Sequence, residues 1–115
     1  MKLTTAPVDN RQIVVAVEGR LDAETCNTLK QAFHDQAARG VQWVTVEMSQ
    51  VTFIDSSGLS ALISGLKTLR QAGGGLNLAA VGNQARTALR LTLLDTVLTI
   101  HDNVAEATAA LQPKT

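Results

Sequence analysis

Apolar positions along the chain fall into short continuous runs that alternate with longer segments of helical spacing. The run at residues 51–54 stops abruptly at Asp55, and apolar residues then recur every three or four positions. This pattern predicts a buried strand followed by an amphipathic helix that ends near Gln71. The apolar face of that helix consists of Leu59, Leu62, Ile63, Leu66 and Leu69.

The same alternation predicts the rest of the chain. We expect strands at residues 2–8, 13–17 (ended by Gly19), 42–48, 51–54, 76–81 and 97–100, with a short break at residues 49–50. We expect a first helix capped by Asp22 and closed by Gly40, with Cys26, Leu29, Phe33 and Ala37 on its buried face. Asn83 is expected to cap a third helix, whose inward residues are Ala85, Ala88 and Leu89. Asn103 is expected to cap a fourth, whose inward residues are Val104, Ala107 and Leu111. We expect the chain to fray at Pro113 and Lys114. Strands that alternate with helices indicate an α/β domain with a mostly parallel sheet of four to five strands and four helices.

The segment Asp55-Ser56-Ser57-Gly58 opens the central predicted helix. An Asp before a helix is typical N-cap chemistry, because its side chain accepts backbone N–H bonds that the helix leaves unpaired. A plain cap is therefore one interpretation of this segment. Because the positive end of a helix also favours added negative charge, a phosphoserine is the other.

Composition limits the function. A chain of 115 residues with 45% hydrophobic residues is a single globular domain over residues 1–115. Its formal net charge is zero, which excludes the basic footprint of a nucleic-acid-binding protein. Cys26 is the one cysteine, so there is no disulfide framework and no metal-ligand pair, and no apolar stretch suits a signal peptide or membrane insertion. We expect a cytoplasmic protein with no cofactor and no metal.

In its motifs the chain resembles the STAS domain family, in its anti-sigma factor antagonist branch. The matching segments are Gly19-Arg20-Leu21-Asp22, Thr52 to Leu59, Gly73-Gly74 before a strand, and the helix and strand from Asn83 to Ile100. The resemblance covers nearly the whole chain and implies a single STAS domain.

The resemblance also implies a partner switch. In that branch the first serine after the Asp, here Ser56, accepts phosphate from an anti-sigma factor with serine kinase activity. The unphosphorylated form sequesters this kinase, and a metal-dependent serine phosphatase removes the phosphate. Asp22, Asp55, Ser57 and Gly58 are the supporting motif residues. The exposed face of the following helix is expected to bind the partner through Ser60, Ser64, Lys67, Thr68 and Gln71.

Two positions depart from the family pattern. Leu93 stands where the family often has glycine, which puts the backbone of residues 92–96 in question. Arg20 stands where well-known antagonists carry an acidic residue, which affects partner choice. No Lys or Arg lies within ten residues of Ser56 in sequence, and we therefore expect no local phosphate clamp.

Two other functions have little support in the sequence, and a third stays open. An enzyme is disfavoured because a serine nucleophile needs an adjacent base, and no recognised motif places His34 or His101 beside Ser56. The three glycines at residues 73–75 lack the Gly-Lys-Ser pattern of a P-loop. The remaining alternative is a STAS adaptor that is not phosphorylated, serving a transporter ATPase or a signalling scaffold.

Overall fold

The protein is built on a single mixed sheet. A computed structural model describes residues 1–111 of the chain. The strand order follows the sequence, with β1 antiparallel to β2 and all later neighbours parallel. The strands are β1 (Lys2–Pro7), β2 (Gln12–Leu21), β3 (Trp43–Ile54), β4 (Gly75–Ala79) and β5 (Ile100–His101). The mostly parallel α/β fold predicted from the sequence is confirmed.

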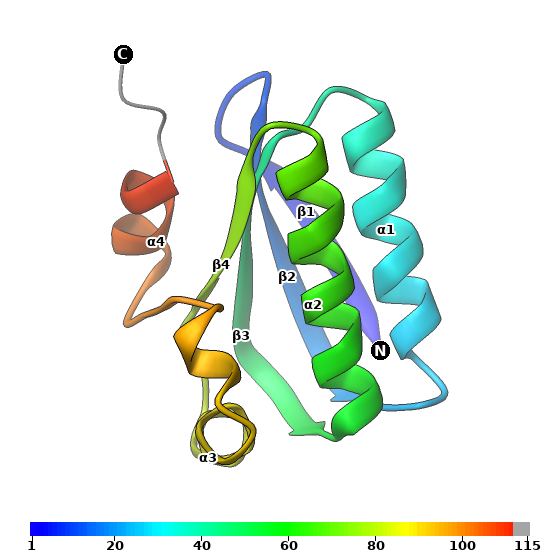
Figure 1. The fold of residues 1–115 in the computed structure, drawn as a ribbon, viewed down its shortest axis with the longest axis vertical. Helices are drawn as coiled ribbons and strands as arrows, with labels where there is room; N and C mark the ends of the chain where they lie inside the picture. Colours follow the sequence, from blue (N-terminus) through cyan, green and yellow to red (C-terminus); the bar gives the residue numbers. More distant parts are fainter. Residues whose placement is uncertain (112–115) are drawn as a thin grey trace.

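Helices cover the two faces of this sheet unequally. They are α1 (Cys26–Ala38), α2 (Ser56–Gln71), α3 (Asn83–Leu91) and α4 (Val104–Leu111), with a short 3-10 turn η1 (Leu94–Thr96). Figure 1 shows α1 and α2 side by side on one face, α4 on the opposite side next to β4, and α3 near the end of β3. The start of α2 therefore lies at the edge of the sheet where β3 ends.

The core between the sheet and the helices α1 and α2 is almost entirely aliphatic. Phe33 of α1 is fully buried, and its ring packs directly on Gly65 of α2. A Cβ at position 65 would stand 3.0 Å from Phe33 Cγ and closer still to two other ring atoms, so glycine is needed where these helices meet. The inward residues expected for α1 and α2 are buried or half-buried.

The opposite face is held to α4 by buried polar side chains. Thr45 Oγ1 donates to Asn77 Oδ1 at 2.7 Å, and Asn77 Nδ2 donates to the backbone oxygen of Ala107 at 2.8 Å. Gln12 Nε2 donates to the backbone oxygen of Thr108 at 2.8 Å. Side chains of β2 and β4 thus bind carbonyl groups of α4, and Thr45 of β3 bonds to Asn77 beneath it. The N-cap predicted at Asn103 is confirmed by its bond from the Glu106 N–H.

Two predicted strand boundaries are wrong. β2 does not end at Gly19, whose φ of +95° accommodates a register shift before Arg20 and Leu21 resume pairing with β3. β3 also runs without a break through residues 49–50, which are exposed because β4 pairs with β3 only as far as Glu47. These two residues are polar because no β4 residue pairs with them, and not because the chain turns there.

Three further predicted element boundaries also shift. α1 begins three residues later than expected. The backbone carbonyl of Asp22 accepts a hydrogen bond from the Cys26 N–H and closes a turn, so Thr25 is the N-cap. Gly82, not Asn83, is the N-cap of α3. The last strand is only Ile100–His101, because η1 and its following turn occupy the preceding residues. The fraying expected at Pro113 and Lys114 lies outside the described residues.

The turn after α3 adopts a conformation that glycine favours. Leu93 has φ +60° and ψ +16°, in the left-handed region, and its side chain is 69% exposed. A leucine there is strained, because its Cβ approaches the following carbonyl oxygen. The fold is thus kept without the glycine common in the family, at the expense of local strain.

Candidate functional site

The candidate site is centred on the junction between β3 and α2, where Asp55 caps the helix. Asp55 has extended backbone dihedrals, and its Oδ1 accepts bonds from the N–H groups of Ser57 at 2.9 Å and Gly58 at 3.1 Å. Its own N–H donates to the carbonyl of Leu21 at 3.3 Å. Of the four N–H groups that a helix start leaves unpaired, three are therefore satisfied within residues 1–111, and the N–H of Ser56 is the fourth. The cap interpretation of Asp55 is confirmed.

Ser56 is the first residue of α2 and is exposed to solvent, whereas Ser57 is half-buried. Of the two adjacent hydroxyls, the one on Ser56 is thus the more accessible to a modifying enzyme. Because Asp55 already occupies the neighbouring N–H groups, a group attached to Ser56 Oγ finds few backbone donors at this helix end. The geometry presents Ser56 outward from a rigid helix start.

Gly58 allows β2 to approach α2 closely. A Cβ at position 58 would contact the carbonyl oxygen of Leu21 and stand 2.7 Å from Ile54 Cγ1 and 2.9 Å from Leu21 Cγ. These neighbours are backbone and fully buried side chains that cannot move aside. The glycine of the motif therefore has a steric role, and it fixes the first turn of α2 on the ends of β2 and β3.

Asp22 lies in the turn next to this junction. β2 pairs Leu21 with Ile54, so the residue that follows each strand, Asp22 and Asp55 respectively, comes to the same edge of the sheet. Asp22 Oδ1 accepts from the Glu24 N–H at 3.0 Å and from Thr25 Oγ1 at 3.3 Å. The strand register thus brings the two acidic motif residues to the same end of the sheet.

Arg20 completes this edge. Its Nε donates to Asp22 Oδ2 at 3.1 Å, and its guanidinium carbon lies 4.5 Å from the centre of the Phe53 ring. The hydrogen bond from Arg20 is the main cause that lowers the pKa of Asp22, and the bonds from Glu24 and Thr25 act in the same direction. Although no basic residue is near Ser56 in sequence, the pairing of Arg20 with Phe53 brings one to the strand end from which Ser56 continues.

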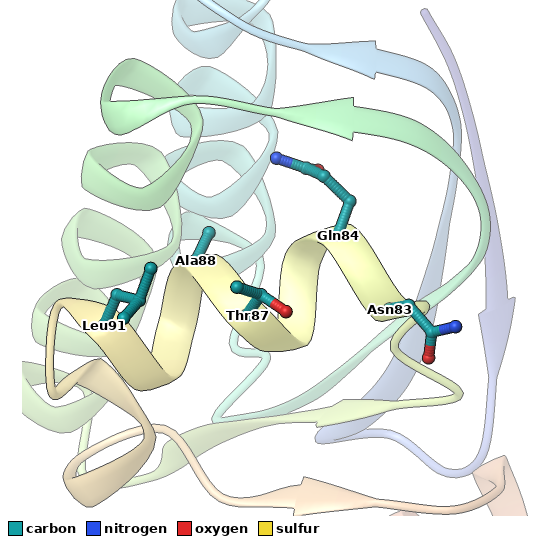
Figure 2. A pocket seen from close by; sticks show the side chains of 5 residues that line it. All are labelled: Asn83, Gln84, Thr87, Ala88 and Leu91. Atoms are coloured by element: carbon teal, nitrogen blue, oxygen red, sulfur yellow. The ribbon is translucent and has the colours of Figure 1, made fainter.

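Gln84 was not singled out from the sequence, although it stabilises the same junction. Its Oε1 accepts from the Ile54 N–H at 2.9 Å and its Nε2 donates to the Ile54 carbonyl at 2.8 Å. Figure 2 shows this side chain extending from α3. Together with Asn83, Thr87, Ala88 and Leu91, it lines a surface hollow of about 460 Å³. A contact across 30 positions between a side chain and a backbone leaves no periodic signal that could have revealed it.

The residues expected to bind the partner lie along α2. Ser60, Lys67 and Gln71 are exposed, whereas Ser64 and Thr68 are half-buried. They recur at spacings of three or four, so they form a continuous stripe that begins one turn after Ser56. The stripe and Ser56 together make one surface.

The two histidines lie away from this surface. His101 pairs with Ala79, which pairs with Glu47, seven residues and so roughly 20 Å along β3 from Ile54. His34 lies in the third turn of α1, about 12 Å along the helix from its start. Within residues 1–111, no group of three or more His, Cys, Asp or Glu side chains is arranged to hold a metal ion. Among the helices of that same part, none is long and apolar enough to cross a bilayer.

The protein is a small α/β domain with an exposed serine at the start of the helix that follows its central strand. Comparison with known proteins gives its family. The STAS domain model matches residues 4–107, and the chain belongs to this family. The anti-sigma F factor antagonist of Paenibacillus polymyxa is 24% identical over 101 residues, which are 87% of this chain and 86% of that protein.

Solved structures agree with this assignment. The crystal structure of an anti-sigma factor antagonist from Mycobacterium paratuberculosis superposes with a TM-score of 0.85 at 26% identity and covers 97% of this chain and 94% of that one. The Bacillus cell fate determinant SpoIIAA in its phosphorylated form superposes with a TM-score of 0.74 at 16% identity, over 96% of this chain and all of that one. The second likeness shows the shared fold.

Proposed function

We propose that this protein is an anti-sigma factor antagonist that switches partners according to phosphate on Ser56. The observation that carries the proposal is the junction itself: an exposed serine at the first position of α2, held by the Asp55 cap and by the packing of Gly58 on Leu21. The naming of relatives as anti-sigma factor antagonists, and a phosphorylated form of one structural neighbour, support it.

The partner in this proposal is an anti-sigma factor with serine kinase activity. Ser56 Oγ attacks the γ-phosphorus of a nucleoside triphosphate held by the kinase, the hydroxyl proton passes to a base on the kinase, and a nucleoside diphosphate leaves. The unphosphorylated antagonist binds the kinase through Ser56 and the stripe of Ser60, Ser64, Lys67, Thr68 and Gln71. A metal-dependent serine phosphatase hydrolyses the phosphate and restores binding. The antagonist itself contributes no catalytic group.

The phosphate acts on the complex through its negative charge and its bulk. Phosphorylation adds about −1.5 to −2 charges at a protein surface. Asp22 and Asp55 already lie at this edge, and the helix N-terminus offers little further hydrogen bonding, because Asp55 occupies two of its N–H groups. The added charge therefore disfavours the complex by repulsion and by its bulk, while the sheet and helices keep their positions.

Phosphopeptide mapping of the protein purified from its native cells tests this function. Trypsin releases one peptide that spans residues 40–67, and fragmentation separates Ser56 from Ser57, Ser60 and Ser64. We expect phosphate on Ser56 that disappears in Ser56→Ala and persists in Ser49→Ala, the matched control at an exposed serine of β3 in the same peptide. Absence of phosphate under all growth conditions, together with no co-purifying ATP-binding protein, would favour the unphosphorylated adaptor instead.

A further inference from the structure

Arg20 can separate from Asp22 at little cost in free energy. Arg20 is 62% exposed on its side chain and Asp22 is 17% exposed, and pairs near solvent contribute little to stability. Asp22 Oδ1 keeps its bonds from the Glu24 N–H and Thr25 Oγ1 whether or not Arg20 is present. Departure of Arg20 therefore leaves no buried carboxylate without a partner.

The guanidinium of Arg20 also retains unused donors. Within residues 1–111, only its Nε makes a hydrogen bond, which leaves both terminal nitrogens free for an oxyanion. The Phe53 ring, 4.5 Å from the guanidinium carbon, supports the planar group from one side. An arginine oriented in this way is suited to bind phosphate oxygens with two parallel bonds.

A phosphate on Ser56 needs such a donor. The acidic side chains at this edge are those of Asp22 and Glu24 in the turn and of Asp55 at the cap. The N–H groups of Ser57 and Gly58 are already bonded to Asp55, so the helix start cannot enclose the phosphate. At equal distance, a dianion on Ser56 attracts the Arg20 guanidinium more strongly than the single charge of Asp22 does.

From this arrangement we infer that Arg20 is the counter-ion of phosphorylated Ser56, and that phosphorylation transfers its guanidinium from Asp22 to the phosphate. The inference rests on the proposed function for its biological role, since it assigns a positioning residue to the same switch. Its consequence is a second change at the surface: as the phosphate appears, the positive charge beside Phe53 is withdrawn from any partner. The switch thus alters two contacts at once.

The test uses the full chain with phosphoserine introduced at position 56 during translation, so that no natural kinase is required. The second pKa of the phosphate, read by ³¹P NMR, is expected to rise by about 0.5 to 1 unit in Arg20→Gln. Arg20→Lys is expected to restore part of that shift, since it keeps the charge and loses the planar fork. Arg39→Gln, an exposed arginine at the other end of α1, is the matched control and should leave the phosphate unchanged.

A second readout follows Arg20 itself. Its Nε–H resonance should move on phosphorylation at Ser56 and stay in place when the phosphoserine is at position 60, one turn further along α2. Equal phosphate pKa values in Arg20→Gln and Arg39→Gln, or an unmoved Nε–H resonance, would overturn the inference. Because the phosphate is installed without the kinase, this result is independent of whether cells phosphorylate Ser56, which peptide mapping decides separately.

Discussion

Gln84 and Ile54 form a closed pair in which one side-chain amide bonds both backbone groups of the last residue in β3. The two bonds measure 2.9 and 2.8 Å and reproduce the pairing that a neighbouring strand would supply. β4 pairs with β3 only as far as Glu47, so the end of β3 has no strand on this side. α3 thus supports the residue directly before the Asp55 cap.

Replacement of Gln84 by Ala should loosen this strand end. We expect a loss of about 1 to 2 kcal/mol in the free energy of unfolding, because two hydrogen bonds disappear. The Ile54 amide should also exchange its hydrogen faster with solvent. Thr87→Ala, exposed and nearly one turn further along the same helix, should change neither quantity. Unchanged exchange at Ile54 in Gln84→Ala would show that the pair does not stabilise the strand.

The Asp55 cap can be tested apart from the charge of its carboxylate. Asp55→Ala removes the acceptor for two N–H groups and should lower the free energy of unfolding by about 1 kcal/mol. Asp55→Asn keeps an acceptor oxygen and should lose much less. Chemical denaturation of the three proteins side by side gives the comparison, and equal losses in both variants would assign the effect to charge.

Gly58 should not tolerate a side chain. Gly58→Ala places a methyl group against the Leu21 carbonyl and within 2.9 Å of buried carbons, and we expect destabilisation by about 1 to 3 kcal/mol. Without this contact, alanine in a helix would be favoured over glycine by about 1 kcal/mol. Ser60→Ala, exposed in the same helix, is the control and should be neutral or slightly stabilising. A gain in thermal stability for Gly58→Ala would contradict the close approach.

Leu93 offers a stabilising substitution. Leu93→Gly relieves the left-handed strain and should raise the free energy of unfolding by about 1 kcal/mol, since the exposed side chain contributes few contacts. The same change at Leu91, 75% exposed but helical, should be destabilising by about 1 kcal/mol. Changes of opposite sign in the free energy of unfolding at these two exposed leucines would assign the effect to the backbone conformation of Leu93. Changes of the same sign would refute it.

The Arg20–Asp22 pair predicts a pH dependence. Because the folded state lowers the pKa of Asp22 below its ordinary value of 3.8, chiefly through Arg20, the pair stabilises the fold fully above about pH 4. That contribution is lost as the pH falls through the lowered pKa and Asp22 takes up a proton. The Asp22 pKa, followed by carboxyl NMR, should therefore rise in Arg20→Gln and stay low in Arg39→Gln. A pKa of Asp22 that does not respond to Arg20→Gln would show that Glu24 and Thr25 alone lower it.

The sequence predicted the layers of the fold well because periodicity reports burial directly. The predicted apolar faces of α1 and α2 are buried or half-buried. In the run of β2, alternate residues are buried and the two between them are half-buried. Predicted strand boundaries were wrong where a polar residue or a glycine did not mark the end of a strand. Ser49 and Gln50 are polar because their strand lacks a neighbour, and Gly19 lies within a strand whose register shifts.

The candidate site was predicted in part. The cap at Asp55 follows from local chemistry, which involves residues two and three positions apart. The contributions of Arg20, Phe53 and Gln84 depend on strand register and helix placement, which no local pattern encodes. The phosphate acceptor Ser56 and its partner surface stay predictions until the modification is measured.

The attachment of α4 has a consequence for how this protein can evolve. Asn77 and Gln12 bind carbonyl groups of Ala107 and Thr108, which every amino acid supplies in the same form. Most outward positions of α4 are therefore free to accept substitutions as long as the helix persists and Ala107 stays small beneath it. The sheet binds the backbone of this helix and not particular side chains. Relatives can therefore differ in the sequence of this helix and retain the same architecture.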